Sequence, residues 1–303
     1  MSIKRAHSKR TLSTAIIALL FVLIALLLTV NSDKLHNEKT TSDNPVQVGK
    51  CDDYVRFLDV GQGDCALITS NGVSMLIDTG TPEGADELCA KLKKYGITDI
   101  NTIMLSHFHN DHAGGIDAVT SRFNVSNLIY PDPSKSDSML SGAVNAKKTV
   151  LAEDGELYIA KQGMVIKFGD CELTVLGYFG DESDENDRSV FAMAEIHGKK
   201  FLFTGDAGKA AEKRLLSQKL NIKCNVLKVG HHGSNTSSTE DFLAACSPEY
   251  ASISCGLGNI YSHPGEATIA RLEEKRIEFY RTDLNGDITF AVDSNGIYPS
   301  TEK

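Results

Sequence analysis

Three histidines and one aspartate lie within six residues in segment 107–112, which reads His-Phe-His-Asn-Asp-His. The segment follows an apolar stretch at 102–105 that we expect to be a buried strand. Imidazole and carboxylate groups together suit zinc, manganese or iron. A single histidine is usually an ordinary surface or core residue, but four potential ligands this close together predict a metal site. We expect His107 and His109 to face one ion, and Asp111 and His112 to face a second.

Two later segments end in side chains of the same kind. The apolar stretch 201–205 is followed by Asp206, and the stretch 226–230 is followed by His231 and His232. Each would be an ordinary turn or loop if it stood alone. Beside the first cluster, a carboxylate at a strand end can bridge two ions. The histidine pair is expected to supply one ligand and one proton-transfer group.

Five motifs resemble those of hydrolases with the metallo-β-lactamase fold. They are LDVGQGD (58–64), LIDTG (76–80), SHFHNDHAGG (106–115), FTGD (203–206) and KVGHHGS (228–234). The first motif, together with 261–264 and 280–288, is similar to the soluble hydrolase domain of ComEC-type competence proteins. The resemblance covers about residues 54–292. It implies an α/β fold, an αββα sandwich with the metal site at one edge of the sheets.

The resemblance also implies a ligand set. It assigns His107 and His109 to a first ion and Asp111 and His112 to a second, with Asp206 bridging and His231 completing the second site. The family usually adds a third histidine to the first ion, but the matching stretch 185–189 reads Glu-Asn-Asp-Arg-Ser. We therefore expect a first site that is weak, completed by Asn186 or Asp187, or empty. His197 is nearest, but it lies in a hairpin turn and is expected to point away.

Several further residues are candidates for supporting roles. Asp78 is expected either to orient a ligand histidine or simply to form a turn. The tight loop at Gln62 and Asp64 is expected to face the substrate or to be a plain hairpin turn. The complete set of predicted substrate contacts is Gln62, Asp64, Asn186 and Ser234. His263 precedes a proline, and the family pattern places it at the mouth of the site.

These assignments predict a metal-dependent hydrolase. Two ions about 3.5–4 Å apart hold a hydroxide between them, and water bound to zinc reaches a pKa near 7. Asp111 would orient this metal-bound hydroxide, and His232 or His263 would protonate the leaving group. The expected cofactor is one or two divalent ions, zinc or manganese. The serines present are not in the G-x-S-x-G pattern of a serine hydrolase.

The predicted reaction is cleavage of a phosphodiester by a phosphodiesterase or nuclease, with DNA or a phosphocholine-type ester as the substrate. Two alternatives stay open, which are hydrolysis of another bond, such as a β-lactam or thioester, and a metal-holding surface module without catalysis. The sequence predicts no protein partner.

The elements that must position these residues are a mixture of strands and helices. Expected strands lie at 54–60, 65–69, 73–77, 102–105, 128–130, 164–168, 172–176, 190–197, 200–204, 225–229 and 250–254, with short strands within 277–292. Expected helices lie at 82–95, 113–121, 207–219, 239–246 and 265–275, and 131–146 is expected to be a polar loop. Two sheets with helices outside them would accommodate this order.

The N-terminal region differs from the rest of the chain. Residues 1–11 form a basic tail, and 12–30 are a 19-residue apolar run without charge, which is long enough to cross a bilayer. The basic flank predicts a cytoplasmic N-terminus, so the domain at 51–303 would lie outside the cell membrane after a polar linker at 31–50. The alternative is a cleaved signal peptide and a secreted domain.

Charge and cysteine content limit the possible partners. Residues 1–50 carry seven Lys/Arg and three acids, so residues 51–303 carry a net charge of −13 within a total of −9. A domain this acidic is a poor general binder of nucleic acid. The seven cysteines include no CxxC pair, and we expect free thiols.

Overall fold

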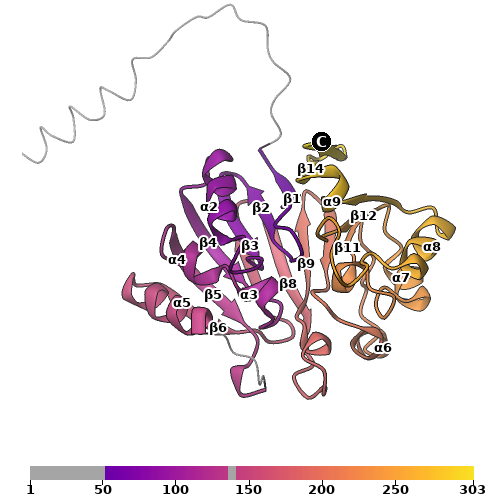
Figure 1. The fold of residues 1–303 in the computed structure, drawn as a ribbon, viewed down its shortest axis with the longest axis horizontal. Helices are drawn as coiled ribbons and strands as arrows, with labels where there is room; N and C mark the ends of the chain where they lie inside the picture. The colour runs from indigo at the N-terminus through magenta and orange to yellow at the C-terminus, as the bar shows by residue number, and fades with distance from the viewer. Residues whose placement is uncertain (1–51, 136–140) are drawn as a thin grey trace, which may run out of the picture. The chain divides into compact units, whose positions relative to one another are not determined.

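Two β-sheets packed face to face form the centre of the computed structural model, which describes residues 52–135 and 141–303 (Figure 1). The first sheet has the strand order β15-β14-β1-β2-β3-β4-β5-β6. Its strands are β1 Tyr54–Phe57, β2 Ala66–Ser70, β3 Val73–Ile77, β4 Asp99–Met104, β5 Asn124–Tyr130, β6 Glu156–Ile159, β14 Ile288–Val292 and β15 Ile297–Thr301. The second sheet has the order β13-β12-β11-β10-β9-β8-β7. Its strands are β7 Val165–Phe168, β8 Cys171–Gly177, β9 Phe191–Ile196, β10 Lys199–Phe203, β11 Val226–Lys228, β12 Tyr250–Ile253 and β13 Glu278–Arg281.

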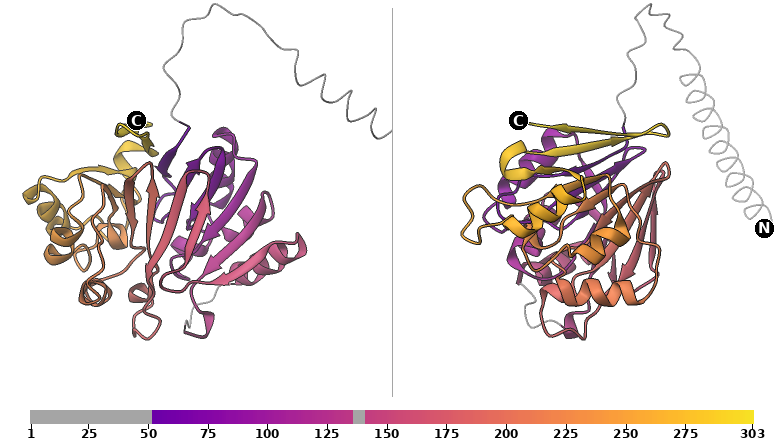
Figure 2. Two further views of the ribbon diagram at one scale, coloured as in Figure 1. Left: turned by 180° about the vertical axis from the view of Figure 1, so that it is seen from behind. Right: turned by 90° about the vertical axis from the view of Figure 1, so that its right-hand side faces the viewer.

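Helices cover the outer face of each sheet, on opposite sides of the sandwich (Figure 2). The first sheet is covered by α2 Ala85–Lys94, α4 Ile116–Thr120 and α5 Ser141–Ala152, with the short α3 Asn110–Ala113 near its edge. The second is covered by α6 Lys209–Ser217, α7 Glu240–Cys246 and α8 Glu266–Glu274, and α9 Thr282–Asn285 follows β13. The predicted α/β class and two-sheet sandwich are therefore confirmed.

Three apolar layers hold this arrangement together. The middle layer lies between the sheets and includes Phe57, Phe201 and Phe290, which are almost completely buried. The outer layers lie between each sheet and its helices. In α2, for example, Leu88 and Leu92 recur four residues apart and face the first sheet.

One predicted segment is wrong in part. The stretch 131–146 was expected to be a polar loop, but α5 begins at Ser141. Its buried face consists of the small residues Ala143 and Ala146 together with Val150, and it packs against α4 and β5. Small side chains give a weak periodic signal, so the polar residues around them dominated the pattern.

The topology brings several loops to one edge of the sandwich. Strands β3 and β4 are parallel, and so are β10, β11 and β12. Carboxyl ends of parallel strands lie at the same edge of a sheet, and ligands commonly bind there. The motifs at 78–80, 106–115, 204–208 and 229–234 all follow these strands.

The predictions for residues 1–11, 12–30 and 31–50 lie outside the described residues. Within 52–135 and 141–303, no helix combines the length and the apolar character needed to cross a membrane.

Candidate metal centre

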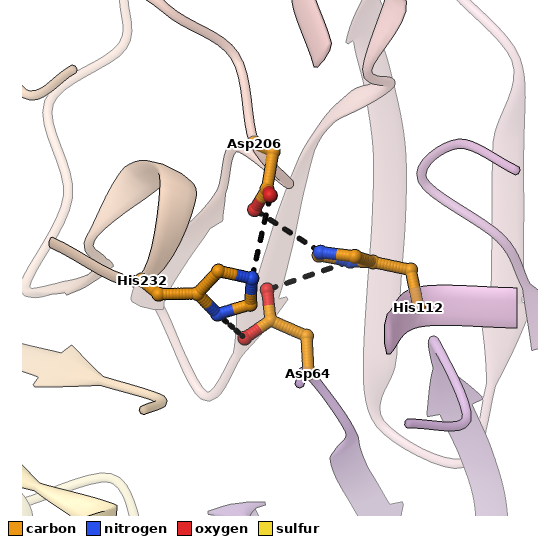
Figure 3. Close-up of side chains that lie close together, drawn as sticks. All are labelled: Asp64, His112, Asp206 and His232. Carbon is orange, nitrogen blue, oxygen red and sulfur yellow. Dashed lines mark ion pairs between the residues drawn. The ribbon is translucent and has the colours of Figure 1, made fainter. Parts of the chain in front are cut away.

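Four buried side chains converge where these loops meet: Asp64, His112, Asp206 and His232 (Figure 3). The two imidazoles lie between Asp206 on one side and Asp64 on the other. Asp206 Oδ1 lies 3.1 Å from Nε2 of His112, and Asp206 Oδ2 lies 3.3 Å from Nε2 of His232. Asp111 lies next to them, with Oδ2 3.1 Å from the same Nε2 of His232.

The side chains of this cluster fit a divalent cation. Within the described part of the chain, His112 Nε2 and Asp206 Oδ1 are fully buried and make no hydrogen bond, although they are 3.1 Å apart. A buried polar atom without a partner costs about 1–3 kcal/mol. A cation between the imidazole nitrogens and the carboxylates of Asp111 and Asp206 would satisfy these atoms, and nitrogen and oxygen ligands of this kind suit zinc or manganese.

Each imidazole of the cluster is held through its other ring nitrogen. His112 Nδ1 lies 2.8 Å from Oδ2 of Asp78, and Asp78 also accepts a 2.7 Å hydrogen bond from the backbone N–H of Ser106. His232 Nδ1 lies 2.9 Å from the backbone oxygen of Ser254. Contacts of this kind fix the ring orientation and the tautomer of metal-binding histidines. The sequence left open whether Asp78 orients a ligand histidine or only forms a turn, and in the structure its carboxylate contacts His112.

The charges of the cluster also favour a divalent cation. Burial lowers the pKa of His112, but Asp206 and Asp78 raise it well above its usual value. Burial raises the pKa of Asp206, but His112 and His232 hold it well below its usual range. Carboxylates that favour positive charge on buried imidazoles would equally attract a metal ion.

The geometry of His231 and His232 differs from the roles predicted for them. The sequence assigned His231 as a ligand and His232 as a proton donor. Instead, His232 is buried with Nε2 between Asp111 and Asp206, whereas Nε2 of His231 is 3.9 Å from Asp206 and 3.4 Å from Nδ2 of Asn186. The geometry therefore favours His232 as the ligand. Both residues have positive φ angles of 49° and 53°, and a sequence pattern cannot indicate which member of such a turn points inward.

The other side of the centre contains His107 and His109. His107 is fully buried, and its Nε2 lies 3.1 Å from Nδ1 of His109. Its Nδ1 lies 3.0 Å from Oγ of Ser106 and 3.4 Å from Oγ of Ser189. The ring of His112 packs on that of His107 with centroids 4.1 Å apart, but its nitrogen atoms face Asp206 and Asp78. Among the described residues, no histidine from a later segment contacts the ring of His107 or His109.

Asn186 and Asp187 were predicted as residues that could complete the first site, whereas His197 was expected to point away from it. Asp187 accepts a 2.8 Å hydrogen bond from the N–H of Gly208. His197 lies in a hairpin turn with Nε2 2.7 Å from Asp53. Asn186 lines the cleft above the centre, and its Oδ1 is buried without a hydrogen bond within the described ranges.

One member of the cluster, Asp64, forms a buried ion pair. Asp64 was predicted to face the substrate, but it is only 5% exposed and pairs with Lys228 of β11. Burial lowers the pKa of Lys228, but Asp64 and Asp206 raise it above its usual value, so the ammonium stays charged. Asp64 also lies 3.6 Å from Nδ1 of both His112 and His232.

Lys228 is the residue that sequence analysis missed, because it was quoted in a motif without a role. The signal was available, because Lys228 is a charged residue within the otherwise apolar run 226–229. A lysine in a buried strand needs a charged partner nearby, and here the partner is Asp64.

A cleft of about 340 Å³ opens above the metal centre. Its lining residues are Gln62, His109, Asn110, Asp111, Asn186, Asp206, His231, His232, Tyr261 and His263. The predicted substrate contacts Gln62 and Asn186 and the predicted proton donor His263 are therefore at the cleft. Ser234 is not, because it is buried and its hydroxyl lies 3.0 Å from that of Thr236.

Comparison with known proteins agrees with this geometry. Residues 58–256 match the profile of the Metallo-beta-lactamase superfamily. The chain belongs to this superfamily. Its members are generally metal-dependent hydrolases, so the cluster is a candidate divalent metal site of the expected kind.

The curated relatives include ComE operon and competence proteins. The chain is 30% identical to "ComE operon protein 3" of Bacillus subtilis over 269 residues, covering 81% of this chain and 34% of that protein. It is 31% identical to "Competence protein ComA" of Neisseria gonorrhoeae over 258 residues, covering 84% and 35%. The predicted resemblance to the ComEC-type subfamily is thus confirmed, and the chain spans about a third of the length of these relatives.

A solved structure supports the fold. The metallo-β-lactamase fold protein YhfI of Bacillus subtilis superimposes with a TM-score of 0.54 at 10% identity, covering 82% of this chain and all of that one. At this identity the likeness concerns the fold alone.

Proposed function

We propose that this protein is a metal-dependent phosphodiesterase, with a nuclease as its most specific form. The observation that carries the proposal is the convergence of Asp111, Asp206 and His232 at an open cleft, with His112 buried directly behind them. The similarity to competence proteins supports a phosphodiester over other bonds, because competence concerns DNA. The negative net charge of residues 51–303 limits extended nucleic-acid binding, but it does not oppose cleavage at a single phosphodiester.

Each residue at the cleft has a role in this proposal. A divalent ion bound by the cluster would polarise a phosphoryl oxygen and activate a water molecule. Asp111, whose carboxylate is 29% exposed at the cleft floor, accepts a hydrogen bond from the attacking water and orients it. The amides of Gln62 and Asn186 lie on the cleft wall, where they donate hydrogen bonds to the remaining phosphate oxygens.

With His232 in the cluster, His263 becomes the group that faces the leaving oxygen. Burial, together with the nearby His231 and His232, lowers the pKa of His263 to about 4. The ring is then neutral at pH 7, so it stabilises the leaving oxygen by donating a hydrogen bond from an N–H.

A binding module without catalysis is the second candidate. The observation that favours it is the first ion site at His107 and His109, for which the described residues supply no third histidine ligand. A module of this kind would hold a metal ion and bind the same cleft ligands without turnover.

One experiment separates these candidates. The purified full-length chain is loaded with Zn²⁺ or Mn²⁺ and assayed on bis(p-nitrophenyl) phosphate, a single-stranded oligonucleotide and a chromogenic cephalosporin, with and without chelator. We expect chelator-sensitive cleavage of the phosphodiesters only, and none by Asp206→Ala. Cleavage of the cephalosporin alone would contradict the proposal, and stoichiometric metal binding without turnover would favour the binding module.

We also propose that residues 12–30 anchor the protein in the cell membrane with residues 51–303 outside. The charge-free apolar run and its basic flank support this topology. Protease added to intact cells should digest the domain while a cytoplasmic marker survives. A domain recovered from the medium without residues 1–30 would favour the secreted alternative, and protection until lysis would contradict both.

A further inference from the structure

The loop between β12 and α8 carries an unusual group of exposed apolar side chains beside the cleft. Leu257 is 81% exposed, Ile260 is 89% exposed and Tyr261 is 61% exposed. Tyr261 also lines the cleft above the metal centre. Single exposed apolar residues are ordinary, but a group of this kind at the rim of a binding site indicates a contact surface.

Internal hydrogen bonds give this loop a defined shape. Asn259 Nδ2 donates hydrogen bonds of 2.9 Å to the backbone oxygen of Gly256 and 2.6 Å to that of His263, and Asn259 Oδ1 accepts one of 3.0 Å from the N–H of His263. Gln62 Oε1 holds the start of the loop through the N–H of Gly256 at 3.0 Å. The side chain of Asn259 is thus turned inward, whereas the apolar side chains of the loop are exposed. This is the reverse of the usual preference, and it pre-organises apolar contact.

Three rings lead from the metal centre to this rim in nearly parallel orientation. The rings of His232 and His263 have centroids 6.3 Å apart with planes inclined by 25°. The rings of His263 and Tyr261 have centroids 5.8 Å apart and are inclined by 26°. These separations lie in the range of stacked aromatic pairs. The outer face of Tyr261 therefore offers the next position in the series.

We propose that Tyr261 is a stacking platform for the nucleobase that flanks the scissile phosphate, so that the substrate is a single-stranded or frayed end of nucleic acid. This rests on the proposed phosphodiesterase function. Stacking on an exposed aromatic ring is how many proteins bind bases of single strands, and a base within a duplex would not be available for it. Leu257 and Ile260 extend the apolar surface toward the adjoining sugar or base.

The shape of the cleft favours a base over a choline group. A quaternary ammonium is bound by a cage of several aromatic faces, whereas Tyr261 is the one Phe, Tyr or Trp side chain that lines the cleft in the described part of the chain. The same lining residues include no lysine or arginine. Contact therefore involves few phosphates, and binding should depend only weakly on salt.

The test compares substrates with and without a base. The metal-loaded full-length chain is assayed for kcat/KM on a short labelled oligothymidylate and on the same oligomer made abasic beside the cleaved bond. Tyr261→Ala should lower kcat/KM on the intact oligomer by about 5- to 100-fold, the usual effect of removing one stacking ring. It should have little effect on the abasic oligomer. Tyr261→Phe should restore the wild-type rate, and Tyr158→Ala, which removes an exposed tyrosine from the edge strand β6, should leave both rates unchanged.

Each other outcome identifies what failed. Equal losses on both oligomers would show that Tyr261 only supports the loop, and equal wild-type rates on both would overturn the platform while the phosphodiesterase stands. Wild-type protein that cleaves no diester would overturn the proposed function. The stacking role of Tyr261 would then be tested by the binding of the labelled oligomers, measured by fluorescence anisotropy. Only the intact oligomer should bind, and its binding should depend on Tyr261. Binding to phosphatidylglycerol vesicles that Leu257→Ala and Ile260→Ala abolish, with oligomer cleavage unchanged, would assign the loop to a lipid surface instead.

Discussion

The two sides of the metal centre differ in how completely they are built. On the side of His112 and His232, both imidazoles are buried, point at Asp206 and are fixed through their other nitrogen atoms. On the side of His107 and His109, the two rings lie against each other, and within the described ranges the other hydrogen-bonding partners of His107 are the hydroxyls of Ser106 and Ser189. Outer contacts of ligands commonly affect metal affinity by about 10–100-fold. We therefore expect one tightly held ion on the first side and a weakly held ion on the second.

This difference shows that a run of four potential ligands does not make two equal sites. The sequence places His107, His109, Asp111 and His112 within six residues, but the affinity of each site depends on what other strands bring to them. Asp206, Asp78 and His232 all join one side. The following predictions test this asymmetry.

Asp206→Ala should have the largest effect. Its two carboxylate oxygens face both ligand imidazoles, so its loss should empty the tight side and destabilise any ion on the other. We expect activity to fall by at least about 10³–10⁴-fold, the upper range for one positioned group. Metal content by mass spectrometry and turnover on a phosphodiester are the measurements. Full metal content in a folded variant would refute the ligand assignment.

His232→Ala and His231→Ala should separate the two adjacent histidines. If His232 is the ligand, its removal should lower the affinity for the tight ion by more than about 100-fold, beyond the effect of an outer contact. His231→Ala should keep that ion, because its Nε2 is 3.9 Å from Asp206. Competition with a coloured chelator measures both affinities. The opposite pattern would restore the assignment made from the sequence.

Lys228→Met tests the ion pair beneath the tight side. It would leave the buried Asp64 without its lysine partner and with only the imidazoles of His112 and His232 at 3.6 Å, which should cost about 3–5 kcal/mol of unfolding free energy. The double variant Lys228→Met/Asp64→Leu removes both charges and should recover most of that loss. Urea unfolding followed by circular dichroism measures all three proteins. A single variant as stable as the wild type would mean that the pair does not hold the sheets together there.

His107→Ala should have the smallest effect on metal content. We expect it to remove only the weakly held ion, with the tight ion retained. The converse change, Asn186→His, offers a further imidazole near this side and should raise the affinity for the second ion by roughly 10-fold or more. Titration of the metal-loaded protein with a second equivalent of Zn²⁺ resolves the weak step. Two ions of equal affinity in the wild type would contradict the asymmetry.

The sequence by itself determined most of the strands and the segments that carry the metal chemistry. Apolar stretches such as 73–77 and 201–205 alternate with turn residues, and each strand predicted with its bounds is present with ends within four residues of those expected. Strands β6 and β15 were not predicted. The cluster at 107–112 was recognisable because its ligands are close together in the chain. Local patterns report on local contacts, and these features depend on little else.

Only the tertiary structure decided which side chains share an environment. Asp64 and Lys228 are 164 positions apart in the chain, and nothing in either motif shows that they pair across the two sheets. The inward direction of His232 instead of His231 depends on a left-handed turn and on the backbone oxygen of Ser254 from another strand. Tyr261 became a candidate for substrate binding only when the loop at 255–264 was seen at the rim of the cleft. Contacts between segments far apart in the chain place these groups together, and the local sequence around each group does not indicate which residue it contacts.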